Sequence, residues 1–232
     1  TLNASTVLSN TAANGGGLLS QGVGAVATVS NSRFAYNTAT SGGGIFNNGS
    51  MTIAGSTIDH NRATAGAGLH NFGGSLAMTN STVSHNDASD NGGGLYNRAS
   101  ATATFVTFHA NSAGGVGGNL FNDEASIALG STIVAGAVTG ANCANSAGFI
   151  NSTGYNVESA STCALSGTGD LANTDPLLGV LKDNSGPTPT HALRIDSPAI
   201  DRAPGGANGC GVQIKSDQRG ITRPVNASCD AG

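Results

Sequence analysis

The chain has 232 residues, of which 36 are glycine, and 9% of its residues are charged. Its formal net charge is −4, with 9 lysines and arginines against 13 aspartates and glutamates, so it lacks the basic surface typical of nucleic-acid binding. No apolar run approaches the roughly 20 residues of a membrane-spanning helix, and we expect no membrane span. Large apolar residues are scarce while Gly, Ser, Thr and Asn are abundant. The composition therefore favours a fold that depends heavily on backbone pairing.

From its start to about residue 134 the chain carries an internal repeat. In five segments an apolar residue is followed three positions later by asparagine, at positions 10, 37, 61, 86 and 111, which are 27, 24, 25 and 25 residues apart. Each of the last four segments is followed by a Gly-containing cluster, an apolar-led pair and a second asparagine, at Asn47, Asn71, Asn97 and Asn122. A third short run, such as residues 51–53, precedes the next copy.

A period of about 25 residues with three short runs per copy predicts three strands per coil. Leucine-rich repeats share this period but need Leu at several fixed positions, and helical repeats need strong helix formers. The chain has neither, so we predict an all-β fold, a right-handed single-stranded parallel β-helix. We expect one domain over residues 1–232, with regular coils in 1–134 and less regular coils with an irregular, loop-rich C-terminal cap in 135–232.

Like residues are expected to stack in columns about 4.8 Å apart, the normal strand spacing. One inward column is predicted to form a core ladder of Val7, Phe34, Ile58, Val83, Phe108 and Ile133. A second inward column contains Leu18, Ile45, Leu69, Leu95 and Leu120. At one corner we expect an asparagine ladder, in which amides donate and accept between coils, formed by Asn10, Asn37, Asn61, Asn86 and Asn111.

The two ends of the chain are expected to differ. Five of the 6 prolines lie between residues 187 and 224, and because proline cannot donate to a ladder, we expect this end to be loop-rich and to lie over the last coil. The first residues enter a coil directly, so either a cap has been lost or another subunit covers that edge, and end-to-end self-association is one expected partnership. Residues 1–5 lack the basic and apolar parts of a signal peptide, which suggests a mature or trimmed start.

Four cysteines form two local pairs, Cys143 with Cys163 and Cys210 with Cys229. Their spacing does not fit a zinc site. We predict two structural disulfides in an exported protein, with four buried thiols as the alternative.

Two sets of motifs resemble known families. Phe34-Ala35-Tyr36-Asn37 followed by Gly42-Gly43-Gly44-Ile45 resembles the repeats of polymorphic outer-membrane proteins. The C-terminal third resembles bacterial secreted β-helix proteins with a choice-of-anchor domain, through NTDPLLG (173–179), GPTPTHAL (186–193), SPAID (197–201) and DQRG (217–220). The resemblance implies a secreted or cell-surface bacterial protein, often an adhesin or passenger domain, with no defined catalytic residues. It also implies a chain that continues beyond residue 232.

Two groups of polar residues in the repeat are candidate catalytic or metal sites. Asp59, Ser84 and His109 fall in one column, one position after the core ladder, and are expected on a solvated outer face. A hydrolase triad needs histidine between carboxylate and hydroxyl, but stacking puts Ser84 in the middle, so we expect no catalysis there. His60 and His85 lie one coil apart and would suit a transition metal, but no third ligand is apparent, so we expect them to pack at a corner.

A third histidine and the C-terminal acids also have structural interpretations. His70 takes the place of Phe46 and Tyr96 in its column and is expected to stack with them. Acids near the C-terminus would suit a β-helix lyase or hydrolase, or a calcium ion, if they converged: Asp170, Asp175, Asp183, Asp196 and Asp201. They are spread through irregular sequence, where Asp typically caps turns. We expect no cofactor, with structural calcium as the alternative.

These patterns predict a secreted or cell-surface structural protein of a bacterium that acts as an adhesin, scaffold or fibre-forming subunit. Its expected partners are further copies of itself or a surface glycan or protein. The alternative is a polysaccharide lyase or glycoside hydrolase on the same fold, because fold does not fix function. We expect a non-enzymatic role and therefore name no catalytic, cofactor or metal residues.

Overall fold

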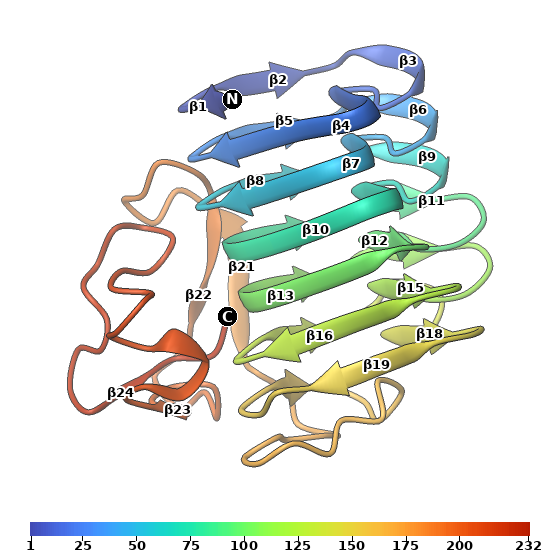
Figure 1. Cartoon of the computed structure of the whole chain (residues 1–232). Coiled ribbons are helices and arrows are strands. Elements are labelled where there is room, and N and C mark those ends of the chain that lie inside the picture. The colour runs from blue at the N-terminus through green and yellow to red at the C-terminus, as the bar shows by residue number, and fades with distance from the viewer.

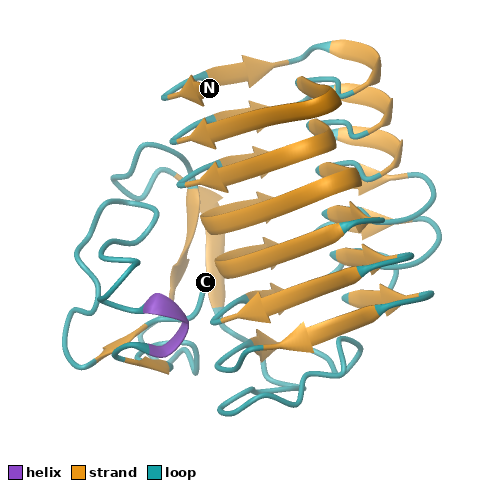
Figure 2. Cartoon of the chain, viewed as in Figure 1, coloured by secondary structure: helices purple, strands orange, loops and turns teal.

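The computed structural model describes the backbone of residues 1–232 and every side chain except that of Val23. The chain winds in a right-handed sense through about six coils of about 25 residues, each lying against the one before it (Figure 1). This confirms the predicted parallel β-helix. Strands make up the coils, whereas loops and a short helical turn dominate the C-terminal part (Figure 2).

Parallel strands line the faces of the coils. The larger sheet holds β1 (Leu2–Asn3), β4 (Leu18–Ser30), β7 (Ile45–Ala54), β10 (Leu69–Ser84), β12 (Leu95–Asn97), β13 (Ser100–His109), β15 (Leu120–Asn122), β16 (Ser126–Gly130), β18 (Cys143–Asn145) and β19 (Phe149–Ser152). The same sheet continues around a corner through β2 (Thr6–Leu8), β5 (Arg33–Ala35), β8 (Thr57–Asp59), β17 (Ile133–Ala135) and β20 (Val157–Glu158). A separate sheet, whose strands the sequence does not single out, holds β3 (Thr11–Asn14), β6 (Thr38–Ser41), β9 (Arg62–Ala65), β11 (Asp87–Ala88) and β14 (Ser112–Ala113).

The core consists of inward columns in register. Val7 pairs with Phe34, and the column continues through Ile58 and Val83 to Phe108. The second column runs in register through Leu18, Ile45, Leu69, Leu95 and Leu120 and ends on Cys143. The side chains of Phe34, Ile58 and Phe108 are completely buried. Each coil alone buries little, so stacked neighbours are what exclude water from this narrow core.

The predicted place of Ile133 in the core ladder is wrong. Phe108 pairs with Val134, and Ile133 pairs with Thr107 on the outward side of the strand. Asn97 pairs with Asn122, 25 positions on, but Ala101 pairs with Ile127, 26 positions on. One extra residue therefore lies in the turn after Asn122. A one-residue shift reverses the face of each side chain in the strand that follows, so Ile133 packs under the C-terminal segment.

The predicted asparagine ladder lies at the corner that follows the core ladder. Side-chain amides donate from Asn10 to Asn37, then to Asn61, Asn86 and Asn111, at 2.9–3.0 Å between nitrogen and oxygen. The file then continues through Asn119 and Asn142, which lie in a different part of the repeat. In this way the ladder extends past the point where the sequence period loses asparagine.

Two further side-chain ladders hold the other corners. Asn47, Asn71, Asn97, Asn122 and Asn145 form a second amide file with nitrogen–oxygen distances of 2.6–2.9 Å. At another corner the hydroxyls of Ser32, Ser56 and Ser81 each accept a backbone N–H from the preceding coil. Buried backbone donors at these bends are thus paired, as the low water content of the interior requires.

Glycine is required where coils approach most closely. A Cβ placed on Gly44 would lie 2.6 Å from the carbonyl oxygen of Gly68 and 2.9 Å from a methyl carbon of Ile58. No side chain fits at that distance without moving backbone. The Gly-containing cluster of the repeat is therefore explained by packing between coils as well as by turn geometry.

The C-terminal part does not lie over the last coil as predicted. Residues 159–175 close that end instead, with Leu171 forming a bridge to Val157. Later residues run back beside the coils (Figure 1). They form two antiparallel strand pairs and a 3₁₀ turn: β21 (Leu178–Lys182) with β22 (Thr190–Leu193), β23 (Ala203–Pro204) with β24 (Ser228–Cys229), and η1 (Ala207–Gly209). The outward side chains of the coils offer a larger surface for packing than the coil end does.

The two predicted disulfides are present and join Cys143 to Cys163 and Cys210 to Cys229.

Candidate functional site

The hairpin of β21 and β22 covers the outward column that was expected to face solvent. Thr57 donates its hydroxyl to the carbonyl of Pro189 at 2.6 Å, and Thr188 donates to the carbonyl of Gly55 at 3.0 Å. Asp59 and Ser84 are fully buried, so the expectation of a solvated face is wrong for both. The covering strand places a polar cluster between the coils and the C-terminal segment.

Ser84 is the centre of this cluster. Its Oγ lies 2.8 Å from Nε2 of His191 on β22 and 2.7 Å from Nδ1 of His85. His191 Nδ1 lies 2.7 Å from the carbonyl oxygen of Gly179, which only an N–H can satisfy. We therefore assign Nε2 of the neutral ring as acceptor for the Ser84 hydroxyl, with His85 donating to the same oxygen.

Asp59 forms the second half of the cluster. Arg33 binds it with two hydrogen bonds, from Nε at 2.8 Å and Nη2 at 2.6 Å, and His60 Nδ1 lies 2.8 Å from Oδ2. The bond to Asp59 raises the pKa of Arg33, because the carboxylate stabilises the guanidinium. Asp59 is thus a buried carboxylate whose charge is compensated within its own face of the coils.

Three histidines, His191, His85 and His109, lie close together in this cluster, and the pKa of each is lowered. Burial lowers the pKa of His191 to about 4, and the charges of His109 and His85 act in the same direction. The pKa values of His85 and His109 are also lowered, mainly by burial. The ring of His191 stacks on His85, with centroids 5.9 Å apart, and meets His109 edge-on at 4.7 Å.

The predicted column does not form a hydrolase triad. Ser84, Asp59 and His109 stack in the order that the sequence predicts, with Ser84 between the other two. Ser84 itself is fully buried. His60 and His85 stack with centroids 5.0 Å apart and planes 4° apart, so their nitrogens point in parallel directions and do not converge. Among the described residues no three His, Cys, Asp or Glu side chains are placed to hold a metal.

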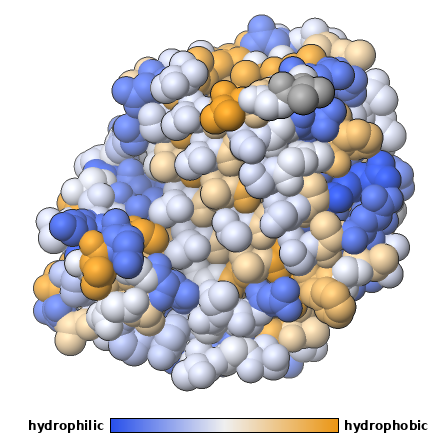
Figure 3. Space-filling view, viewed as in Figure 1, coloured by the Kyte–Doolittle hydropathy of each residue, from blue (hydrophilic) through white to orange (hydrophobic). Residues whose placement is uncertain are grey.

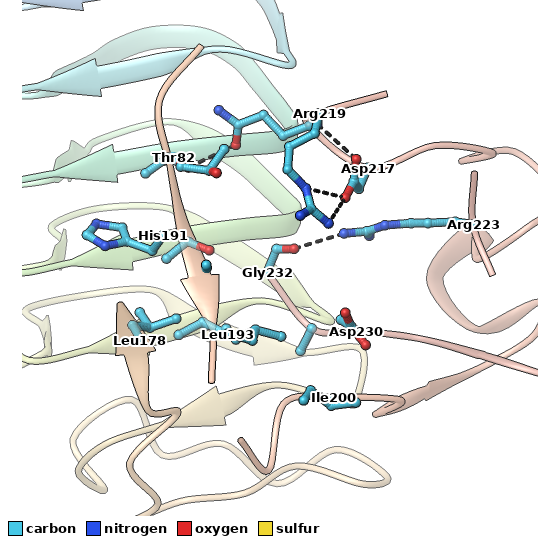
Figure 4. Close-up of a pocket in the computed structure, with 16 residues that line it drawn as sticks. Thr82, Leu178, His191, Leu193, Ile200, Asp217, Arg219, Arg223, Asp230 and Gly232 are labelled. Atoms are coloured by element: carbon cyan, nitrogen blue, oxygen red, sulfur yellow. Dashed lines mark hydrogen bonds and ion pairs between the residues drawn. The ribbon is translucent and has the colours of Figure 1, made fainter. Parts of the chain in front are cut away.

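A cavity of about 240 Å³ lies beside the cluster, between the hairpin, the coils and the loops that follow (Figure 4). Leu178 and Leu193 form an apolar wall, and Arg219 pairs with Asp217 through bonds of 2.9 and 2.6 Å. Arg223 lies 4.2 Å above the Phe105 ring and donates to the carbonyl of Gly232 at 2.9 Å. Burial lowers its pKa to about 10. These charged groups hold the C-terminal loops together.

The C-terminal acids do not converge. Asp170 accepts from Asn156 at the end of the coils, and Asp175 and Asp183 each accept a backbone N–H two residues on. Asp201 donates its backbone N–H to Asp230. Asp196 has no hydrogen bond among the described side chains that relates it to the other four. Four of the five therefore take part in local turns or loop contacts.

His70 lies in an aromatic column on the outward side of the second core column. It stacks on Tyr96 with centroids 4.5 Å apart and meets Phe46 edge-on at 5.2 Å. Its Nδ1 lies 2.5 Å from the Ser41 hydroxyl, and burial lowers its pKa to about 4. The expected stacking of His70 with its column neighbours is what the structure shows.

The widest exposed face is formed by the outward residues of β7, β10 and β13. These residues are small and uncharged: Ser50, Thr52, Ser75, Ala77, Ser100 and Thr102. Figure 3 shows this face as mostly pale, with hydrophilic residues gathered towards its edges. These six residues offer hydroxyl and methyl groups at strand spacing, and none of them is aromatic, although Phe72, earlier on β10, is also exposed.

Sequence reasoning missed His191 and Arg33 as parts of the cluster. His191 is 107 positions from Ser84, and Arg33 is 26 positions from Asp59. Arg33 pairs in register with Thr57, two positions before Asp59, so the repeat period placed its charge diagonally across from Asp59 on the neighbouring coil. His191 lies in irregular sequence, where no period relates it to the coils.

Together, the fold and this cluster define the chain as a parallel β-solenoid with a laterally docked C-terminal segment. No protein-family model, curated protein or solved structure matches it. A search of the described residues finds no helix long and apolar enough to cross a membrane.

Removing the Ser84 hydroxyl is expected to loosen the hairpin. Ser84→Ala leaves Nε2 of His191 buried without a donor, which costs about 1–3 kcal/mol. Hydrogen exchange of residues 178–193 should become faster by about tenfold or more, while β4 and β7 stay protected. Ser100→Ala, on the exposed face, is the matched control and should change neither. Equal exchange in the two variants would show that the Ser84 hydroxyl does not hold the hairpin.

Proposed function

We propose that this chain is an extracellular structural protein of a bacterium that serves as a surface scaffold or adhesin. The observation that carries the proposal is that its polar clusters are used to hold the molecule together. Asparagine and serine side chains join coil to coil, and the Ser84 and Asp59 cluster joins the coils to the C-terminal segment. What remains exposed over the widest face is small and uncharged.

The two disulfides support an oxidising location. Such bonds persist outside the cytosol and are rare within it. Both lie in the less regular half, where Cys143 with Cys163 and Cys210 with Cys229 tie loops to short strands. Resemblance to secreted and surface β-helix proteins supports the same location and the bacterial source.

Native material tests this proposal in two steps. Antibody against the chain should label intact cells of the producing bacterium, and protease added outside should remove the label. Alkylation without prior reduction should modify none of the 4 cysteines. Label that appears only after lysis, or alkylation of all four thiols, would contradict an extracellular role.

A lyase or glycosidase is the alternative to separate from a scaffold. Purified chain is incubated with uronic-acid and neutral polysaccharides, and new reducing ends or unsaturated products are measured. A scaffold gives no turnover but is retained on intact cells or their polysaccharide. Turnover that disappears in an Asp→Ala variant at one of the C-terminal acids would replace the scaffold proposal with the enzyme.

A further inference from the structure

The contact between the C-terminal hairpin and the coils joins segments that are far apart in the sequence. Besides the Ser84–His191 bond, the hydroxyls of Thr57 and Thr188 each donate to a backbone carbonyl on the other side of the contact. The side-chain amide of Gln218 donates to both threonine hydroxyls at 2.9 Å. These bonds involve neutral groups that do not titrate between pH 4 and 8. The histidines are therefore the groups at this contact whose charge changes in that range.

We propose that the β21–β22 hairpin is a pH-controlled latch, docked on the coils at neutral pH and released from them in acid. His191 is the group through which protons act, because it is the histidine that the hairpin itself contributes to the contact. The latch concerns residues 178–193 and leaves the stacked coils in place.

The carboxylates near His191 compensate a charge on its ring only weakly: Asp59 favours the protonated ring less than burial opposes it, and Asp175 acts on the neighbouring His109. The carboxylate on that face is Asp59, and its two oxygens already bind Arg33 and His60. The other groups nearest to His191 on the coils are His85 and His109, which become cations themselves in acid. On the cavity side, the titratable groups are Asp217, Arg219, Arg223 and Asp230. Asp217 is paired with Arg219, and Asp230 accepts the backbone N–H of Asp201.

Protonated His191 can keep its hydrogen bonds, but it cannot avoid the cost of placing a charge away from water. When Nε2 gains a proton, the Ser84 hydroxyl can turn to the carbonyl of His109, 2.9 Å away, and accept from His191. The penalty is therefore that of a half-buried cation placed beside two other histidines. Detachment returns the ring to water and removes this penalty.

The direction of the pH effect follows from the two states. A detached His191 has an ordinary pKa near 6.5, and the docked ring has a pKa of about 4. Docking is therefore at full strength above pH 6.5 and weakens as the pH falls towards 4. Release takes up close to one proton between the two pKa values, so the opening equilibrium rises roughly 40-fold from pH 6.5, where the detached ring is half protonated, to pH 4.5.

Hydrogen exchange at these two pH values, corrected for intrinsic rates, tests the latch. Amides of residues 178–193 should open roughly 40-fold more at pH 4.5, while β4, β7 and β10 stay protected. In His191→Gln, which keeps a polar side chain but does not titrate, the pH effect should vanish. Ser100→Ala, on the exposed face away from the hairpin, is the control, and its response to pH should match the parent chain.

Three results would overturn the latch. One is equal protection of the hairpin at both pH values, and another is the same acid opening in His191→Gln as in the parent chain. The third is loss of protection in all coils together, which is general acid unfolding. If His191→Gln does not fold, NMR titration of the His191 ring in the parent chain decides. A ring that titrates near 6.5 without any change in the hairpin amides refutes the proposal.

Discussion

Asn86→Ala is expected to destabilise the protein by about 4 kcal/mol or more. The Asn86 side chain is completely buried and accepts from the backbone N–H and the side-chain amide of Asn61, at 3.0 and 2.9 Å. It also donates to the carbonyl of Ile58 and to Oδ1 of Asn111. Alanine leaves the buried backbone N–H of Asn61 without its partner and removes one bond each from the Asn61 amide, the Ile58 carbonyl and Oδ1 of Asn111. An unpaired buried group costs about 1–3 kcal/mol, and each lost hydrogen bond adds about 1 kcal/mol.

Chemical denaturation with paired controls measures this effect. Asn10→Ala removes the exposed end of the same ladder, where water replaces the lost bonds, and should cost about 1 kcal/mol or less. A similar loss for both substitutions would mean that the ladder does not stabilise the fold through buried pairing. The denaturant slope should stay unchanged in both, which shows that the same surface unfolds.

Phe108→Ala is expected to lower the free energy of unfolding by about 3–5 kcal/mol. The ring is completely buried in the core ladder, between Val83 and Val134 in neighbouring coils. A coil cannot collapse onto the space left by the ring, because its backbone is fixed at strand spacing by hydrogen bonds on both sides. The cavity therefore persists, and its cost adds to the lost transfer free energy.

Phe149→Ala is the matched control. Phe149 is 71% exposed on β19, so the same chemical change should shift stability by less than about 0.5 kcal/mol. Thermal unfolding of the two variants, with disulfides intact, gives the comparison. A Phe108 variant as stable as the Phe149 variant would contradict the assignment of this column to the core.

The latch experiment and the two substitutions test different sets of contacts. Asn86 and Phe108 act within the coils, where bonds repeat at every turn. His191 acts between the coils and the segment beside them, where contacts occur once. We expect the first two to change global stability and the third to change only local opening.

The repeat made much of the coil architecture predictable. Phe34, Ile58, Val83 and Phe108 stand in the order that their spacing indicates, because each coil places like residues on like. The asparagine ladder was predictable for the same reason, because its residues recur at the repeat interval. Ile133 was misplaced because it lies 25 positions after Phe108, the usual spacing, while an extra residue near Asn122 moves the pairing to 26.

The polar cluster was only half predictable. The column of Asp59, Ser84 and His109 followed from the period, but its burial did not. Burial depends on the hairpin, whose His191 reaches Ser84 across 107 positions of sequence. The continuation of the asparagine ladder through Asn119 and Asn142 was missed, because these residues occupy other positions in the repeat than the earlier members of the ladder.

The sequence by itself determined the coil, its approximate period, its inward columns and its cysteine pairs, since all of these depend on residues near one another or on a repeated interval. Only the tertiary structure decided where residues 176–232 lie and which outward side chains they cover. That placement depends on single contacts between distant segments, such as Thr57 with Pro189 and Ser84 with His191. A contact made once leaves no periodic pattern in the chain, whereas a contact made at every coil does.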